Sequence, residues 1–283
     1  MNKTTKVLIS TIIAFGVYFM LHNLFFKQLI NILNDIFQVY TLSYIIAYLL
    51  IGIPIFVAIP IVHQPKDFFQ SIGLSKNIST GLLFSLLCTL PMLIGYSLVF
   101  KFNFEISLKQ IIVGALAAAF FEEVYFRGYF FGQIFRFTRF GFILSLIIPS
   151  LIFASAHLYQ SQEISTVIGI FSTTFLGSAL FGWTYIEWNN NLWVPIFLHL
   201  FMNLLWMLFS AGDNAFGGFY SNIFRFSTIA IVVIGTIVYK KQKGYTLTIN
   251  KNTIWMKNNQ WSNPQAGAHA SKASTSLSLL HCE

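Results

Sequence analysis

The sequence predicts an all-α membrane protein, a polytopic bundle of about eight transmembrane helices, and two observations support this fold class. First, 56% of the 283 residues are hydrophobic and only 9% are charged, whereas a soluble domain carries about 25% charged residues. Second, the apolar residues form long runs of about 20, the length that a helix needs to cross a bilayer. A membrane β-barrel would instead show short segments of alternating polarity.

Each predicted span is a long apolar run bounded by polar or turn-forming residues, and the connections between spans are short. Several spans contain a proline, which frees a backbone carbonyl inside a membrane helix and favours a kink. These prolines are Pro54, Pro60, Pro91, Pro149 and Pro195. In chain order the predicted spans are residues 7–26, 40–62, 81–100, 110–133, 142–160, 164–186, 192–210 and 223–239.

The distribution of lysine and arginine predicts the orientation of the bundle. If the N-terminus is cytoplasmic, the cytoplasmic ends carry about twice as many of these residues as the opposite ends. The positive-inside rule therefore places both termini in the cytoplasm, and we expect a multi-pass protein of a bacterial plasma membrane. The net charge of +8 then reflects this topology and attraction to anionic lipid, and we expect no nucleic-acid partner.

The chain divides into two parts by composition. Residues 1–240 hold all the apolar runs and form the predicted transmembrane bundle. Residues 241–283 are polar and lack helical or strand periodicity, so we expect a disordered C-terminal tail. No internal repeat is visible, which argues against the transporter architectures that are built from duplicated halves.

A cluster of ionisable residues interrupts the fourth apolar run and marks the place to look for function. Glu122, Glu123 and Arg127 lie in the segment 110–133, and a charge at bilayer depth costs roughly 2.5–3.5 kcal/mol even on the lenient insertion scales. Glu123 and Arg127 are one helical turn apart and can form an i,i+4 ion pair. Glu122 points about 100° away from Glu123, so its partner is expected on another helix. A carboxylate in that position suits a general base.

Two further spans offer polar side chains of the type that catalysis needs. His157 ends the run SLIFASAH, and His199 and Asn203 share one face of the run IFLHLFMN. A lone histidine in a membrane helix is more often a packing residue, and we read His22 in that way. His63 falls between spans, where we expect it to be solvated.

Three motifs together resemble those of one family. Glu122-Glu123-x-x-x-Arg127, Phe153-x-x-x-His157 and His199-x-x-x-Asn203 occur in the order found in the CPBP family of CAAX-processing and bacteriocin-processing intramembrane proteases, also called Abi proteins. The resemblance covers residues 106–210. It implies that Glu122 and His157 activate a water molecule, that His199 and Asn203 stabilise the oxyanion, and that Glu123 and Arg127 orient the site.

The resemblance leaves the metal requirement open. Glu122, His157 and His199 offer one carboxylate and two imidazoles, a ligand set that catalytic zinc uses. We expect no tightly bound metal, and a divalent metal such as zinc is the alternative. On straight helices, Glu122 lies about 18 Å and His157 about 6 Å from the outer boundary, so a shift or break near Pro149 is needed to bring them together.

The leading hypothesis is an intramembrane endopeptidase that cleaves a hydrophobic peptide or a membrane protein, for instance a bacteriocin or signalling-peptide precursor. One alternative is a non-proteolytic scaffold or immunity protein that binds other membrane proteins, as some members of the resembled family do. A proton-coupled transporter would also explain carboxylates at bilayer depth. It predicts two related halves, and the sequence shows none.

Overall fold

The computed structural model describes residues 2–257, and in this part of the chain the architecture is helical, with one isolated β-bridge between Phe140 and Met256. The all-α prediction is therefore confirmed. The α-helices are α1 (Lys3–Phe37), α2 (Tyr40–Ile51), α3 (Ile53–Val62), α4 (Phe68–Ile72), α5 (Ile78–Cys88), α6 (Leu90–Val99), α7 (Leu108–Ile111), α8 (Ala118–Glu122), α9 (Gly132–Phe137), α10 (Phe142–Ser155), α11 (Ile164–Glu187), α12 (Trp193–Leu208) and α13 (Phe219–Gln242).

Every predicted span coincides with a helical segment, but fewer of these segments are long and apolar enough to cross a membrane by themselves. Within the described residues five meet both criteria: Lys3–Phe37, Ile78–Val99, Phe142–Gln160, Ile164–Glu187 and Phe219–Gln242. A sixth is counted if α2 and α3, which meet at a bend of 40°, form one span. Helix α12 has only 16 residues, and the segment 108–137 carries the charged cluster. Of the eight or so spans that we expected, five or six are therefore supported among the described residues.

Two of the prolines within the predicted spans lie in the first turn of a helix, and two lie inside a helix. Pro54 lies in the first turn of α3, directly after the bend at Gly52, and Pro91 lies in the first turn of α6, after a break at Thr89. The first turn tolerates proline because its N–H groups lack intrahelical acceptors. Pro149 and Pro60 instead lie inside α10 and α3. The break that we expected near Pro149 is absent, because α10 continues to Ser155.

The segment 108–137 is one helical rod that changes its winding. It begins as α7, continues as a π-helix η2 (Ile112–Ala117), returns to α-helix in α8, becomes a second π-helix η3 (Glu123–Phe131) and ends as α9. The π form closes i→i+5 hydrogen bonds and is found mostly as single-turn bulges at functional sites. The change from α8 to η3 falls between the two adjacent glutamates.

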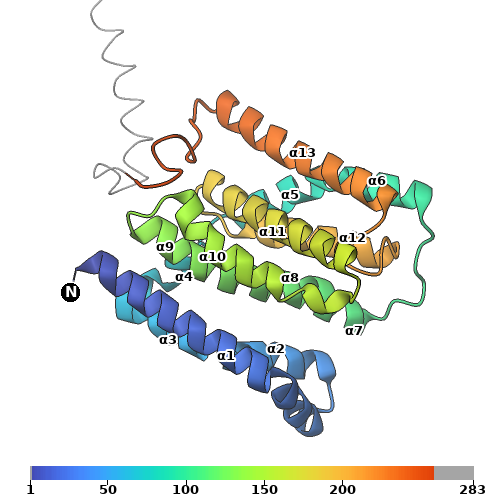
Figure 1. Cartoon of the computed structure of the whole chain (residues 1–283), viewed down its shortest axis with the longest axis horizontal. Helices are drawn as coiled ribbons and strands as arrows, with labels where there is room; N and C mark the ends of the chain where they lie inside the picture. The colour runs from blue at the N-terminus through green and yellow to red at the C-terminus, as the bar shows by residue number, and fades with distance from the viewer. Residues whose placement is uncertain (1, 258–283) are drawn as a thin grey trace, which may run out of the picture.

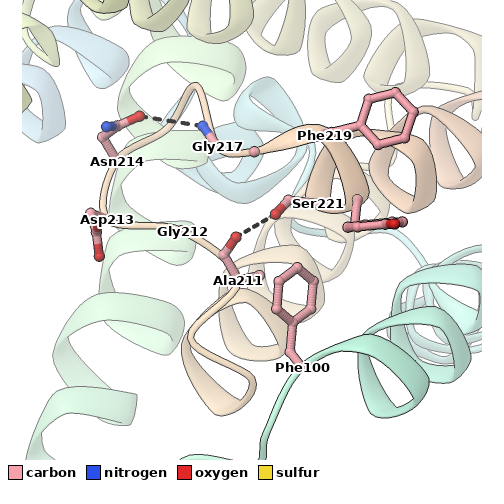
Figure 2. A pocket seen from close by; sticks show the side chains of 10 residues that line it. Phe100, Ala211, Gly212, Asp213, Asn214, Gly217, Phe219 and Ser221 are labelled. Carbon is pink, nitrogen blue, oxygen red and sulfur yellow. Dashed lines mark hydrogen bonds between the residues drawn. The ribbon is translucent and has the colours of Figure 1, made fainter.

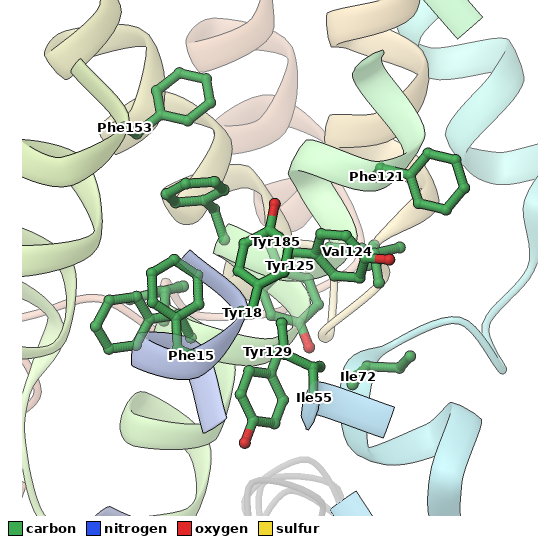
Figure 3. Packing of buried hydrophobic residues seen from close by; sticks show 14 of the residues in the cluster. Phe15, Tyr18, Ile55, Ile72, Phe121, Val124, Tyr125, Tyr129, Phe153 and Tyr185 are labelled. Carbon is green, nitrogen blue, oxygen red and sulfur yellow. The ribbon is translucent and has the colours of Figure 1, made fainter. Parts of the chain in front are cut away.

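This rod lies at the centre of the bundle, between α1–α3 on one side and α10–α12 on the other (Figure 1). Helix α1 packs against α2, α3, η3 and α9, and α12 packs against α5, α8 and η2. All nine side chains of η3 are buried. The largest apolar cluster surrounds it, and Figure 3 shows Tyr18 and Tyr125 packed within that cluster.

The N-terminal end of α1 and the C-terminal end of α13 lie at the same end of the bundle (Figure 1). The lysines and arginines that the sequence analysis assigned to the cytoplasm lie at or beyond the helix ends on that side, for example Lys240 and Lys241 in the last turn of α13. This agrees with termini on one side of the membrane. That this side is the cytoplasm stays a prediction.

The segment after α13 corrects part of the tail prediction. Residues 258–283 of the expected tail lie outside the described residues, but residues 245–257 pack against the bundle. The N–H groups of Gly141, Phe142 and Ile143, at the start of α10, donate to the carbonyls of residues 255, 253 and 254 at 2.7, 2.8 and 2.9 Å. Helix N-termini have unsatisfied N–H groups, and this polar segment supplies acceptors that its composition alone did not reveal.

Candidate active site

The two acidic residues of the site face different directions, as expected for neighbours about 100° apart on a helix. Glu122 ends α8 and Glu123 begins η3. The side chain of Glu123 is fully buried, whereas that of Glu122 is 22% exposed. This difference in exposure agrees with the expectation that Glu122 faces away from Glu123.

Glu123 is the centre of a buried ionic group. Its Oε1 lies 3.1 Å from a terminal nitrogen of Arg127, so the predicted i,i+4 ion pair is confirmed. The same oxygen accepts a hydrogen bond from Nδ1 of His199 at 2.8 Å. A carboxylate can only accept, so Nδ1 of His199 carries a proton and the ring orientation is fixed. Helix α12 is thereby tied to η3 at this point.

Glu122 finds its partner on another helix, as expected, and that partner is His199. Oε2 of Glu122 lies 3.9 Å from Nε2 of His199, beyond hydrogen-bond length. The two nitrogens of one imidazole therefore face the two glutamates. On its other side Glu122 is close enough to Tyr44 and Tyr48 of α2 to interact electrostatically with them.

His157 is held separately from Glu122. It follows the end of α10 and begins a short 3-10 turn, Leu158–Gln160. Its Nδ1 donates to the carbonyl of Phe153 at 2.7 Å, which leaves Nε2 with a free lone pair. Within the described residues no hydrogen bond or ion pair joins His157 to Glu122. The joint activation of a water molecule, which the family resemblance implies for these two residues, therefore stays a prediction.

Asn203 lies one turn beyond His199 on the same face of α12. Its amide Nδ2 donates to the carbonyl of Gly114 at 3.1 Å. A side-chain amide has two N–H groups, so one remains for another acceptor. A Cβ at position 114 would lie 3.1 Å from the end of Met207, which is also on α12, so glycine lets the two helices approach closely here.

The side chains that could bind a metal are not grouped together in the described part of the chain. Within the described residues no group of three or more His, Cys, Asp or Glu side chains is arranged to hold a metal ion. Glu122, His157 and His199 thus do not form the three-ligand set of a catalytic zinc site. The residues present do not fit a bound metal in this arrangement.

The two other histidines of the described chain differ from each other. His22 lies among aromatic rings, stacked on Phe26 at 4.4 Å between centroids, which agrees with a packing role. His63 corrects our expectation of a solvated residue, because it is half-buried and hydrogen-bonded to Gln133 at 2.6 Å. Burial lowers the pKa of His63 from its ordinary value of 6.5.

A pocket lies away from this group, between the end of α6 and the start of α13 (Figure 2). The loop 211–218 forms its wall, and Figure 2 shows Ser221 bonded to Ala211, and Gly217 bonded to Asn214. None of the predicted site residues lines it. It offers one carboxylate, Asp213, and no imidazole.

Some residues of the site were not assigned a role from the sequence. Two phenylalanine rings face the guanidinium of Arg127, Phe153 at 4.2 Å and Phe181 at 5.6 Å. Phe181 also stacks on the ring of His199, at 5.3 Å between centroids. Phe153 was part of a motif, so its position was known. Phe181 is one of 32 phenylalanines, and nothing in the local sequence distinguishes it.

Comparison with protein families identifies the segment that carries this geometry. Residues 104–205 match the family model described as Rce1-like, type II CAAX prenyl endopeptidase Rce1-like. This segment is therefore similar to an Rce1-like domain. No curated protein and no solved structure matches the chain.

The matched segment contains all six residues that the sequence analysis selected, and its bounds lie close to the expected 106–210. It agrees with the resemblance to CAAX-processing proteases and supports an intramembrane endopeptidase. Together with its apolar helices, it indicates an integral membrane protein, for which the lipid bilayer is the surrounding medium.

Proposed function

We propose that this protein is a membrane endopeptidase that hydrolyses a peptide bond in a hydrophobic or membrane-associated peptide, with Glu122 as the general base. The observation that carries the proposal is the arrangement of Glu122, His199 and Glu123. A partly exposed carboxylate faces an imidazole whose other nitrogen is held by a fully buried carboxylate. A base needs access to water and a fixed neighbouring donor, and this arrangement supplies both.

In the proposed reaction Glu122 takes a proton from a water molecule while the water oxygen attacks the carbonyl carbon of the peptide bond. The electron pair of the carbonyl moves to its oxygen and forms an oxyanion. The proton on Glu122 then passes to the leaving nitrogen, the C–N bond breaks, and the new carboxylic acid loses its proton to the medium. One residue thus serves as base and then as acid.

His199 and Asn203 are proposed to stabilise the oxyanion, and the charges of the site support this role. With His199 neutral, the group of Glu122, Glu123 and Arg127 carries a net charge of −1, whereas protonated His199 makes the group neutral. Protonated His199 presents Nε2–H as a donor, and Asn203 retains one N–H after its bond to Gly114.

His157 is proposed to help move the proton. The free lone pair on Nε2, set by the bond from Nδ1 to the Phe153 carbonyl, can accept a proton from water. Because it does not contact Glu122 directly, a water molecule or the substrate must connect the two. We therefore assign His157 a smaller contribution than Glu122.

The substrate is proposed to be apolar because the site lies within a helical bundle with extensive exposed apolar side chains. If the protein is bacterial, a bacteriocin or signalling-peptide precursor is the proposed substrate, by analogy with the resembled family. We further propose that the reaction needs no tightly bound metal, since the candidate ligands do not converge.

The test compares wild type with Glu122→Gln in lipid nanodiscs. Two internally quenched peptides serve as probes, one apolar and unmodified, the other a farnesylated CAAX peptide. Glu122→Gln keeps the shape of the side chain and removes the base, so we expect a loss of about 100- to 10,000-fold in kcat. Glu105→Gln, at an exposed position in a connecting loop, is the matched control and should cleave like wild type.

Other outcomes would change the proposal. If Glu122→Gln folds normally and cleaves as fast as wild type, the assignment of the base is wrong. If wild type cleaves neither probe, and mass spectrometry of host peptides finds no product that depends on Glu122, the scaffold or immunity role replaces the protease. Loss of cleavage after chelation by 1,10-phenanthroline, with recovery on adding zinc, would show that a metal takes part.

A further inference from the structure

Phe153 contacts both halves of the candidate site through different atoms. Its ring lies against the guanidinium of Arg127, with 4.2 Å from Cζ to the centroid. Its carbonyl accepts the hydrogen bond from Nδ1 of His157, and its ring packs against the His157 ring at 4.7 Å. The side chain is 6% exposed, and Figure 3 shows it projecting from α10 at the edge of the aromatic cluster.

The ring of Phe153 matters because Arg127 has few other partners. The guanidinium is 1% exposed, and its Nε and both terminal nitrogens lack a hydrogen-bond acceptor among the described residues. Its ion pair with Glu123, at 3.1 Å, is the one polar contact that compensates its charge. An aromatic face attracts a cation through its quadrupole, most strongly where water is absent. Phe153 is closer to Arg127 than Phe181, so it supplies the larger part of this attraction.

Arg127 in turn determines where Glu123 lies, and Glu123 determines the orientation of His199. The same oxygen, Oε1 of Glu123, contacts Arg127 and accepts from Nδ1 of His199. A shift of Arg127 would therefore move Nε2 of His199 relative to Glu122. Catalytic groups must be held to within about 0.5 Å of their productive geometry, so a small shift is enough to slow a reaction.

We infer that Phe153 is a positioning residue of the site. Its ring holds the line of contacts from Arg127 through Glu123 to His199, while its carbonyl orients His157. One residue thus sets both imidazoles relative to Glu122. This inference rests on the proposed protease function, since it concerns the rate of that reaction.

The test weakens the ring face without changing its shape. Phenylalanine at position 153 is replaced, by amber suppression, with mono-, di- and trifluorophenylalanine, which withdraw electron density from the ring stepwise. We expect kcat for the apolar quenched peptide to fall at each step, by about tenfold in total, because each added fluorine weakens the attraction between the ring face and the desolvated guanidinium of Arg127. KM should stay constant, because Phe153 positions other residues and does not contact the substrate.

Phe131 provides the matched control for packing. It is fully buried, it packs against the rings of Phe135 and Phe142, and no cation lies over its ring among the described residues. The same fluorinated series at Phe131 should leave kcat unchanged. Two ordinary variants supplement the series: Phe153→Tyr keeps the aromatic face and should stay within a few-fold of wild type, and Phe153→Leu should lose about tenfold in kcat.

The outcomes separate the two proposals. A flat response to fluorination at position 153, while Glu122→Gln abolishes cleavage, overturns the role of Phe153 and leaves the protease function standing. An equal fall at Phe131, or a fall in kcat that follows the unfolding temperature, shows that ordinary packing is responsible and also overturns it. If wild type cleaves no peptide at all, the protease function fails and this inference fails with it.

Discussion

Two buried acid–base pairs in this molecule differ in how completely their polar atoms are satisfied. Glu187 of α11 pairs with Lys240 of α13, and its two oxygens also accept the N–H groups of Thr248 and Ile249 at 3.0 and 2.8 Å. Glu123 and Arg127 are equally buried, yet Oε2 of Glu123 and the nitrogens of Arg127 lack hydrogen-bond partners among the described residues.

This difference in hydrogen bonding indicates the role of each pair. Buried polar groups are nearly always hydrogen-bonded, and the exceptions often mark a reactive site. The Glu187–Lys240 pair, whose carboxylate oxygens are both bonded, fastens the segment 245–257 to the end of the bundle. The Glu123–Arg127 pair leaves hydrogen-bonding capacity unused, next to the imidazole of His199. We therefore expect the first pair to determine stability and the second to determine activity.

The largest expected effect is a loss of activity when Glu123 is replaced by glutamine, compared with the same replacement at Glu187. Glu123→Gln keeps the size of the side chain but can present an N–H, in place of an acceptor, to Nδ1 of His199, so the imidazole loses the contact that orients it. We expect kcat to fall roughly 10,000-fold, as when the orienting carboxylate of a catalytic triad becomes an amide. Glu187→Gln should cleave within a few-fold of wild type. Both rates are measured with the quenched apolar peptide.

Thermal unfolding in detergent controls for loss of fold. Glu123→Gln also weakens the pairing of Arg127, so its activity is interpreted at a temperature where circular dichroism shows native helix content. If Glu187→Gln lost as much activity as Glu123→Gln at equal helix content, the proposed division between stability and activity would be wrong.

A smaller effect, on stability, is expected at Lys240. Lys240→Met removes the cation and leaves the carboxylate of Glu187 buried with only backbone donors. Removing one partner of a buried pair costs about 3–5 kcal/mol, so the unfolding temperature should fall while kcat at low temperature is unchanged. Lys241→Met, at the exposed neighbouring position, is the control and should unfold like wild type. An unchanged unfolding temperature for Lys240→Met would show that the pair contributes nothing to stability.

The comparison also explains which parts of the molecule the sequence could predict. The positions of the helices follow from apolar runs, and the Glu123–Arg127 pair follows from helical spacing, because both depend on near neighbours in the chain. The Glu187–Lys240 pair joins residues 53 positions apart, and neither residue lies in a recognisable pattern. The packed segment 245–257 escaped prediction for the same reason, since its carbonyls cap a helix more than 100 positions earlier.

Within the site the same limit applies. The sequence identified Glu122, His199 and Asn203 as candidates, but it could not show that one imidazole lies between two glutamates. That contact depends on how α12 packs against α8, which no residue pattern predicted. It also could not show that His157 and Glu122 are held apart, which requires the relative positions of α8 and α10.

The smallest expected effect is on the pH dependence of stability. It concerns a hydrogen-bonded pair outside the candidate site, His63 and Gln133. His63 at the end of α3 bonds to Gln133 of α9, and burial lowers its pKa below the ordinary value of 6.5. The unfolded chain therefore binds a proton at a higher pH than the folded protein, so stability falls as the pH decreases through about 6.5. His63→Gln has no proton to bind, and its unfolding temperature should fall less between pH 7 and pH 5 than that of wild type. Equal slopes for the two proteins would show that His63 is solvated in both states, as the sequence first suggested.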